Sequence, residues 1–297
     1  MSVAIVHRPK VTPVCQEHAV LYPHQYNQII QAALQEDLAR GGDLTSQALI
    51  PPTHTSELFI QAREPGVLAG SAIVAAVFAQ LDEHVTVTFC TEEGAALQAG
   101  QTVASIQGPT RSILAGERTA LNFLGHLSGI ATATADLCAR VHPYNSMITC
   151  TRKTLPGLRA LQKYAVRVGG GYNHRMALDD AVLIKDNHIA LAGGVAQALK
   201  RARAAVGHMV AIEIEVDTLE QLEEALAHGA RIILLDNMDL ETLSQAVQRC
   251  AGQAITEASG GITPDRVHDI AATGVDVISV GWLTHSARNL DFGLDVL

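Results

Sequence analysis

The first third of the chain alternates between helical and strand-like spacing of its hydrophobic residues. Apolar positions recur at helical intervals over residues 23–40, and Gly41 and Gly42 follow, which predicts a first helix that ends there. The later segments predict a strand, a helix, a strand and then short strands with tight turns, over residues 57–64, 71–80, 85–90 and 94–108. These elements predict a small α/β sandwich.

A long helical pattern without proline follows at residues 111–140, with leucines that recur along it. We expect this helix to link two domains, with Gly125 and Gly129 breaking or bending it.

Beyond residue 145 the pattern changes to short apolar runs separated by helical or glycine-rich segments. Six runs predict strands, at residues 147–151, 181–184, 210–216, 232–235, 254–257 and 277–280. Strands that alternate with helices predict a parallel sheet. Only about 150 residues remain, whereas a full eight-stranded barrel takes roughly 250. The pattern therefore predicts either an incomplete barrel of about six strands or an open sheet.

The predicted fold class is thus α/β, an N-terminal α/β sandwich domain followed by an incomplete, about six-stranded parallel α/β barrel. We expect a flexible N-terminal leader, a sandwich domain to which the C-terminal segment returns, and a catalytic barrel domain, at residues 1–22, 23–128 with 284–297, and 129–283.

Composition narrows the class of protein. The chain has 297 residues and a net charge of −9, which makes nucleic acid or an anionic membrane a poor partner. Its longest apolar runs fall short of the roughly 18–20 residues that span a bilayer. The five cysteines are widely spaced and form no C-x-x-C pair, so we expect buried structural thiols in a reducing, cytoplasmic compartment.

Polar or glycine residues follow every predicted strand of the second domain. Because ligands bind at the carboxyl ends of parallel strands, these residues should line one site. In strand order they are Arg152 and Lys153, Lys185, Glu215, Asp236, Ser259 with Gly260, and Gly281.

The expected site is cationic in its first half. Seven lysines and arginines and three aspartates lie between Thr151 and His188, so an anionic ligand is expected there. Arginine binds carboxylate or phosphate with two parallel hydrogen bonds, and lysine supplies a mobile charge. Three of the seven fit a solvated helix face better than the site: Arg159, Lys163 and Arg167. His174 is equally compatible with an anion-binding donor and with a core histidine.

The other half of the expected site offers carboxylates and a glycine turn. Glu215 and Asp236 could hold Mg²⁺, which prefers one or two carboxylates plus substrate phosphates, or each could pair with a nearby lysine or arginine. Glu213 lies on the same face of its strand as Glu215 and could support it. Ser259, Gly260 and Gly281 could cradle a phosphate. The sequence contains no Walker A motif, dinucleotide fingerprint or H-E-x-x-H motif.

These residues stand in a recognisable run. TRKTLPGLRALQKYAVRVGGGYNHRMALDDAVLIKDNHI, at 151–189, resembles the signature of the quinolinate phosphoribosyltransferase family. The resemblance continues through EDLARGGDLTS, GPTRSILAGERTALNFLGHLSGIAT, EIEVDTLEQL, LLDNM, EASGGI and SVGWLTHSARNLDFGLDV, and so covers nearly the whole chain.

The resemblance implies a reaction, a metal and an assembly. The expected reaction converts quinolinate and phosphoribosyl pyrophosphate to nicotinate mononucleotide, CO₂ and pyrophosphate, with Mg²⁺ and no organic cofactor. It also implies a homodimer or higher homo-oligomer in which Arg111 enters the neighbouring subunit's site.

The resemblance further implies a role for each matched residue. Arg152, His174 and Arg175, with the partner's Arg111, would bind the carboxylates of quinolinate. The implied catalytic groups are Lys153, Lys185, Glu215 and Asp236, of which the lysines would neutralise pyrophosphate and the acids would hold the metal. The implied phosphate ligands are Ser259, Gly260 and Gly281.

Three other functions remain open on the sequence. One is a related protein of the same fold that uses another acceptor, such as the molybdenum-associated type. Another is a Schiff-base aldolase that uses Lys185, and the last is a non-catalytic anion-binding module. The complete TRKT and GGGYNHR motifs favour quinolinate.

Overall fold

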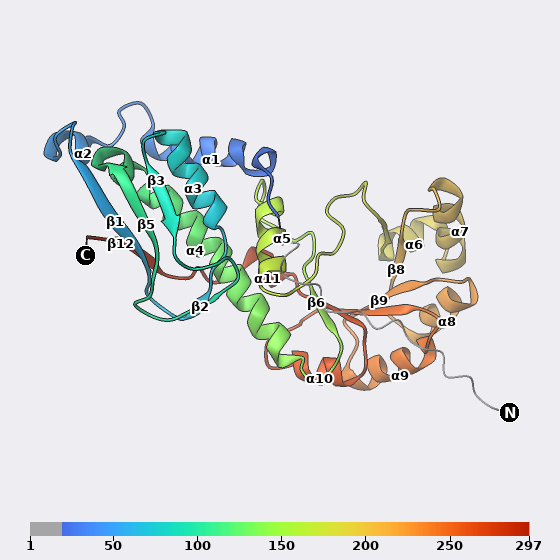
Figure 1. The fold of residues 1–297 in the computed structure, drawn as a ribbon. Helices are drawn as coiled ribbons and strands as arrows, with labels where there is room; N and C mark the ends of the chain where they lie inside the picture. The colour runs from blue at the N-terminus through green and yellow to red at the C-terminus, as the bar shows by residue number, and fades with distance from the viewer. Residues whose placement is uncertain (1–19, 297) are drawn as a thin grey trace. The chain divides into compact units, whose positions relative to one another are not determined.

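The computed structural model describes residues 20–296, which divide into two compact units. We call residues 136–152 and 171–281 the barrel unit, and the described residues 20–135, 153–170 and 282–296 the sandwich unit. Figure 1 traces the chain through both. Nearly all of the expected leader, residues 1–19, lies outside the described part of the chain.

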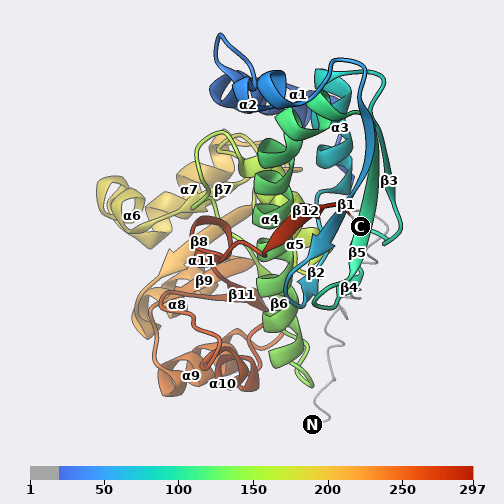
Figure 2. The ribbon, with the colours of Figure 1, turned by 90° about the vertical axis from the view of Figure 1, so that its left-hand side faces the viewer.

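An antiparallel sheet of four strands, in the order β12-β1-β5-β3, forms the centre of the sandwich unit. Helices α3 and α4 lie along one face of this sheet (Figure 1 and Figure 2). The strands of the unit are β1 (Thr55–Ala62), β2 (Gly66–Val67), β3 (Thr86–Phe89), β4 (Ala96–Leu97), β5 (Thr102–Pro109) and β12 (Phe292–Asp295). Its helices are α1 (Pro23–Leu38), α2 (Leu44–Leu49), α3 (Ser71–Leu81), α4 (Thr110–Arg140, whose last turn belongs to the barrel unit), α5 (Arg159–Val168) and α11 (Trp282–His285).

Strand β1 shows how the sequence pattern builds this sheet. Its side chains alternate between buried and more exposed positions, and Leu58, Ile60 and Ala62 are the buried ones. Both neighbours of β1 run antiparallel to it, and β12 pairs through Ala62 and Phe292. The last strand of the chain thereby joins the sheet that the first strand begins.

Helix α4 is continuous from Thr110 to Arg140, so its glycines do not break it, and the alternative expectation of a bend stays a prediction. The two glycines admit the C-terminal segment instead. A Cβ atom at Gly125 would lie 2.7 Å from the carbonyl oxygen of Leu290, and one at Gly129 would overlap the carbonyl oxygen of Arg288. The backbone N–H of Leu290 also donates to the carbonyl of Gly125, at 2.9 Å.

Residues 153–170 group with the sandwich unit, although the expected boundary placed them in the barrel domain. Helix α5 packs against α1 and α11, and the hydroxyl of Tyr164 donates to Glu93 at 2.6 Å. The expectation that Lys163 lies on a solvated helix face is wrong, because this residue has no exposed surface. Helical spacing alone does not tell which face of a short helix will be covered.

Six parallel strands form the sheet of the barrel unit, in the order β6-β11-β10-β9-β8-β7. The predicted strand count and parallel direction are confirmed. The strands are β6 (Met147–Thr149), β7 (Val182–Ile184), β8 (Ile212–Val216), β9 (Ile232–Asp236), β10 (Ile255–Ser259) and β11 (Val277–Ser279). The helices are α6 (Asp186–Ala192), α7 (Val195–Ala205), α8 (Leu219–Ala227), α9 (Leu240–Cys250) and α10 (Val267–Ala272), and α8 to α10 lie along the outer side of the sheet (Figure 1).

Two general features of the described residues bear on earlier expectations. No helix among residues 20–296 is both long and apolar enough to cross a membrane. The cysteines at 90, 138, 150 and 250 are all free thiols. Burial raises the pKa of Cys138 and of Cys250 to about 11, which keeps both unreactive near neutral pH. Cys90 is exposed, so the expectation of buried thiols is wrong for that residue, and Cys15 lies outside the described residues.

The close approach at Gly129 predicts a stability effect. Gly129→Ala should lower the free energy of unfolding by about 1–3 kcal/mol, because the new methyl group overlaps the carbonyl oxygen of Arg288. Gly41→Ala is the matched control, since its methyl group would meet only a side-chain carbon at 3.7 Å and should change stability by less than about 0.5 kcal/mol. Urea unfolding of the variants measures both, and equal stabilities would contradict the packing described.

Candidate active site

The carboxyl ends of the six parallel strands carry the predicted site residues of the barrel unit. Following the sheet from one edge to the other, the order is Arg152, Gly281, Ser259 with Gly260, Asp236, Glu215 and Lys185. Cations stand at the two edges, and the carboxylates and the glycine turn lie between them. The pairing of Ser259 with Asp236 in the register of β10 and β9 brings the turn and one carboxylate to the same level.

Lys185 and Glu215 form an ion pair at one edge of this row. The Nζ atom of Lys185 lies 2.7 Å from Oε2 of Glu215, across the neighbouring strands β7 and β8. Glu215 is 11% exposed and Lys185 is 49% exposed, so water still reaches the lysine. Such a half-exposed pair contributes little to stability. A ligand could therefore displace the lysine from the carboxylate at small cost.

Asp236 is held by the residue that follows it. The side-chain amide of Asn237 donates from Nδ2 to Oδ2 of Asp236 at 2.5 Å. Asn237 has a φ of 54°, in the left-handed region that asparagine tolerates better than most residues, and its backbone N–H donates to the carbonyl of Ser259 at 3.0 Å. Asn237 therefore fixes the carboxylate of Asp236 and joins it to the end of β10.

The turn after Ser259 depends on its glycines. Gly260 has a φ of 92° and Gly261 a φ of 58°. A Cβ atom at Gly260 would overlap the side-chain oxygen of Asn237, so only glycine fits there in this geometry. The turn exposes backbone beside a hydroxyl group, which is the arrangement expected of a phosphate cradle.

Arg152 and Arg175 are close enough for their charges to interact. The Nη1 atom of Arg175 donates to the carbonyl of Ala181 at 2.8 Å. Burial and the neighbouring charge of Arg152 lower the pKa of Arg175, while Glu213 and Asp180 act in the opposite direction. The Nε atom of Arg152 is buried without a hydrogen-bond partner among the described residues. Two guanidinium groups held this closely would be stabilised by an anionic ligand.

His174 faces inward, toward carboxylates. Its Nε2 atom lies 2.9 Å from Oε2 of Glu213 and 3.7 Å from Oε1 of Glu257. All three side chains are at most 14% exposed. Burial and the nearby charge of Glu213 raise the pKa of Glu257. Whether His174 also contacts substrate stays a prediction.

Arg111 and Lys153 belong to the sandwich unit, whereas the strand ends belong to the barrel unit. The fold of the barrel unit alone therefore does not place these two residues at the site. The guanidinium of Arg111 donates from Nε to the carbonyl of Ile50 at 2.7 Å and from Nη2 to that of Gln47 at 2.9 Å. These carbonyls lie at the C-terminal end of α2. Arg111 is therefore oriented by its own chain, and its entry into a neighbour's site stays a prediction.

Sequence reasoning assigned no role to Asn237 or to Glu257. Asn237 was visible only inside the motif LLDNM, and the left-handed conformation that makes it useful follows from its contact with β10. Glu257 lies two residues before Ser259, so strand periodicity could have placed it on the same face. Glu213, which was expected to support Glu215, contacts His174 instead.

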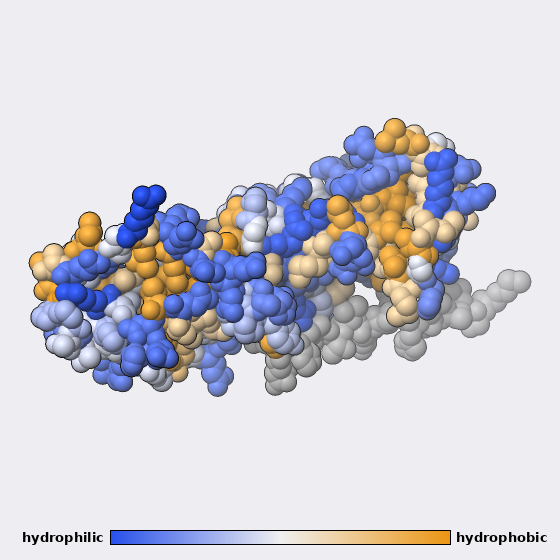
Figure 3. All heavy atoms as spheres, turned by 90° about the horizontal axis from the view of Figure 1, so that it is seen from above, coloured by the Kyte–Doolittle hydropathy of each residue, from blue (hydrophilic) through white to orange (hydrophobic). Residues whose placement is uncertain are grey.

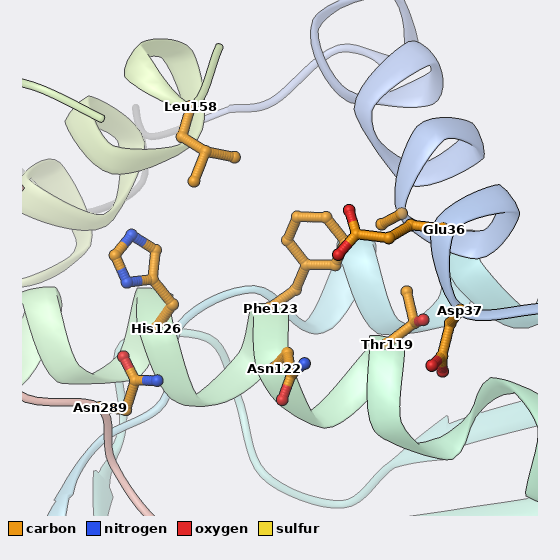
Figure 4. Close-up of a pocket in the computed structure, with 9 residues that line it drawn as sticks. Glu36, Asp37, Thr119, Asn122, Phe123, His126, Leu158 and Asn289 are labelled. Carbon is orange, nitrogen blue, oxygen red and sulfur yellow. The ribbon is translucent and has the colours of Figure 1, made fainter. Parts of the chain in front are cut away.

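A separate hollow of about 430 Å³ lies in the sandwich unit. Figure 4 shows Glu36, Phe123, His126 and Leu158 converging on it from α1, α4 and the segment before α5. Burial lowers the pKa of His126, so this histidine adds no positive charge near neutral pH, and Asp37 adds a second carboxylate. An acidic lining of this kind does not suit an anionic substrate.

Comparisons with known proteins agree over most of the chain. Residues 130–295 match the family model described as "Quinolinate phosphoribosyl transferase, C-terminal domain", and residues 43–128 match that of the N-terminal domain. A "Probable nicotinate-nucleotide pyrophosphorylase [carboxylating]" of Bacillus subtilis is 44% identical over 272 residues, covering 92% of this chain and 93% of the relative. A nicotinate-nucleotide pyrophosphorylase [carboxylating] of Mycobacterium leprae is 46% identical, covering 90% and 95%.

A solved structure agrees as well. The crystal structure of NadC from Streptococcus pyogenes superposes with a TM-score of 0.90 at 42% identity, covering 93% of this chain and 98% of that one.

The contact between Gly260 and Asn237 can be tested by stability. Gly260→Ala should lower the free energy of unfolding by about 2–4 kcal/mol, since it adds backbone strain and an overlap with Asn237. Gly261→Ala, whose methyl group would meet a flexible arginine tip at 3.6 Å, should cost only about 1–2 kcal/mol. Denaturant titration compares the two, and similar losses would show that Asn237 does not pack on the turn as described.

Proposed function

Since the chain belongs to the quinolinate phosphoribosyltransferase family, we propose that it makes nicotinate mononucleotide from quinolinate and phosphoribosyl pyrophosphate, with release of CO₂ and pyrophosphate. It is a pentosyltransferase of de novo NAD synthesis. The observation that carries this function is the row of strand ends in the barrel unit. One arginine, two carboxylates, a lysine and a glycine turn stand there within one sheet, and the charge of Arg175 interacts with that arginine.

Quinolinate would bind beside Arg152 and Arg175. Arg152 and Arg175 lie close enough for the charge of one to lower the pKa of the other, which suits a ligand with two adjacent carboxylates. Lys153 follows Arg152 directly in the chain and is exposed. The partner's Arg111 would complete the carboxylate site, and His174, whose two ring nitrogens are bonded to Glu213 and to the backbone of Arg175, would support it.

Phosphoribosyl pyrophosphate would bind across the remainder of the row. The turn at Ser259 and Gly260, with Gly281 on the next strand, would hold the 5-phosphate through backbone N–H groups and a hydroxyl. Lys185 and Lys153 would neutralise the pyrophosphate as its charge develops. The ion pair of Lys185 with Glu215 keeps the lysine near this position before substrate arrives.

Glu215 and Asp236 have the donor atoms that Mg²⁺ requires. Lys185 and Asn237 each engage one oxygen of these carboxylates, and both acids lie at neighbouring strand ends beside the phosphate turn. This set fits a Mg²⁺ ion that is shared with substrate phosphates, as this metal prefers. When bound, the ion would supply positive charge to the leaving pyrophosphate, directly or through water.

The chemistry then needs positioning more than it needs a protein nucleophile. The pyridine nitrogen of quinolinate attacks C1 of the ribose while the bond from C1 to pyrophosphate breaks. Arg152 and Arg175 fix the ring for this attack, and the lysines stabilise the departing anion. The resulting positive charge on the ring nitrogen then stabilises the electron pair left at C2 when CO₂ departs. That carbon takes up a proton to give nicotinate mononucleotide.

The ion pair of Lys185 argues against an aldolase. A Schiff-base lysine works as a neutral amine in an apolar or charge-repelling site. Lys185 instead lies 2.7 Å from a carboxylate, which stabilises the protonated ammonium. An anion-binding module without catalysis would leave the two carboxylates beside the cations unexplained.

A second copy of the chain is the partner that the surface supports best. Leu44 and Leu49 of α2 are 70% and 73% exposed, next to the carbonyls that orient Arg111. Figure 3 shows hydrophobic side chains gathered at the end of the sandwich unit where Figure 1 places α2. A homodimer that covers this end would carry Arg111 with it. A cytoplasmic location rests on the free thiols of the described residues.

The activity can be tested directly with two acceptors. The purified protein, phosphoribosyl pyrophosphate and Mg²⁺ should form nicotinate mononucleotide and CO₂ from quinolinate, and no product from nicotinate. The reason is that paired arginines suit two carboxylates, and a single carboxylate leaves one cation unmatched. Turnover of nicotinate at a comparable rate, or of neither acid by a folded protein, would contradict the proposed substrate.

Shared sites predict recovery of activity in mixed dimers. Arg111→Ala and Lys185→Ala should each be inactive alone, because every site then lacks one group. After subunit exchange, one site of each heterodimer has both groups intact, so up to about a quarter of wild-type activity should return. Mass spectrometry verifies the exchange, and no recovery in verified heterodimers would contradict a shared site.

A further inference from the structure

A buried layer of acidic side chains lies beneath the proposed site. Glu213 and Glu257 each stand two residues before a site residue on the same strand, Glu215 on β8 and Ser259 on β10. Side chains two residues apart point to the same face, about 6.6 Å further along the strand. Each glutamate therefore lies deeper on its own strand than the proposed ligand that follows it, Glu213 before Glu215 and Glu257 before Ser259. Each is more than nine-tenths buried.

Hydrogen bonding determines which ring nitrogen of His174 carries a proton. The backbone N–H of Arg175 lies 2.8 Å from Nδ1 of His174 and can only donate, so Nδ1 must be an unprotonated acceptor. The proton of the neutral ring is then on Nε2, which faces Oε2 of Glu213 at 2.9 Å. His174 is therefore a neutral imidazole that donates to a carboxylate.

This tautomer argues against a metal site formed by the histidine and the two glutamates. One ligand atom from each of His174, Glu213 and Glu257 lies within 4.8 Å of the others, as in a metal site. A metal ion would need the lone pair of Nε2, however, and that nitrogen carries the proton.

Charge balance supports the same arrangement. Two ionised glutamates beside a neutral histidine would bury two negative charges within a few ångströms. Burial and the nearby Glu213 raise the pKa of Glu257, which favours a proton there. The charge of Glu213 raises the pKa of Arg175, whereas the neighbouring charge of Arg152 lowers it.

We infer that Glu213 and Glu257 are positioning residues for the dicarboxylate site, which they hold in shape through His174. Glu213 fixes the ring of His174, the ring fixes the backbone N–H of Arg175, and Arg175 is anchored at its far end by the carbonyl of Ala181. The carboxylate of Glu213 also offsets the repulsion between the two guanidinium groups. His174 acts through Arg175. This inference rests on the proposed function for its kinetic consequence and on geometry alone for the state of His174.

The state of His174 can be measured without any activity. Nitrogen-15 spectra of the imidazoles, with His174→Gln to assign the signal, should show a proton on Nε2 of His174 at neutral pH. His126 is an internal control with the opposite tautomer, since the side-chain amide of Gln162 lies 2.9 Å from its Nε2 and Asn289 bonds its other side. A proton on Nδ1 of His174, or a doubly protonated ring, would overturn the inference even if the enzyme is active.

Kinetics of matched variants test the positioning role. Glu213→Gln should raise KM for quinolinate by roughly tenfold or more, the effect of one charge-assisted hydrogen bond, with KM for phosphoribosyl pyrophosphate little changed. Glu257→Gln still has an N–H group that can donate a hydrogen bond. It should therefore raise KM for quinolinate much less than Glu257→Leu does. Glu224→Gln on α8 is the control for removing a carboxylate away from the cluster.

The outcomes separate the two claims. Equal effects of the two glutamine variants, or equal changes in KM for both substrates, would show that the acids only fill space and would overturn the inference. Wild-type protein without turnover would overturn the proposed function instead, and the nitrogen-15 result would still decide the state of His174.

Discussion

The common register of six parallel strands is the constraint on which the site depends. Most groups proposed to touch substrate in the barrel unit stand at or just beyond the carboxyl end of a strand, while His174 and Arg175 lie in the segment before β7. Because side chains alternate along a strand, a slip of one residue in β8 would turn Glu213 and Glu215 away together, and with them the partners of His174 and Lys185. The site residues and the buried glutamates that support them therefore depend on the same strand register.

Electrostatics explain why this register carries two layers of charge. The upper layer collects cations that a substrate with several negative charges will neutralise. Without substrate, these cations repel one another. The ion pair of Lys185 with Glu215 and the charge of Glu213 near Arg175 reduce that cost. The sandwich unit contributes through packing and through the orientation of one arginine. Its glycines in α4 admit the C-terminal segment, and Arg111 is oriented by the end of α2.

Much of the barrel unit could be predicted from the sequence, because its strands are specified by short, local patterns of apolar residues. Six apolar runs separated by helices are enough to give the number and direction of the strands, and the residue after each run is enough to place Arg152, Lys185 and Asp236 on one edge. The features that escaped prediction depend on contacts between distant segments. Gly129 has its role because Arg288 lies against it, and Lys163 is buried because α5 packs on α1 and α11. Asn237 takes its left-handed conformation beside β10, which no local pattern reveals.

The central claim is that the paired arginines of the barrel unit bind the two carboxylates of the acceptor. A crystal structure of the protein with quinolinate alone tests it most directly, because no reaction can occur without phosphoribosyl pyrophosphate. The account predicts both carboxylates on Arg152 and Arg175, with His174 still bonded to Glu213 beneath them. Quinolinate bound in the hollow beside His126, or bound at the strand ends through Lys185 with the arginines unoccupied, would contradict it.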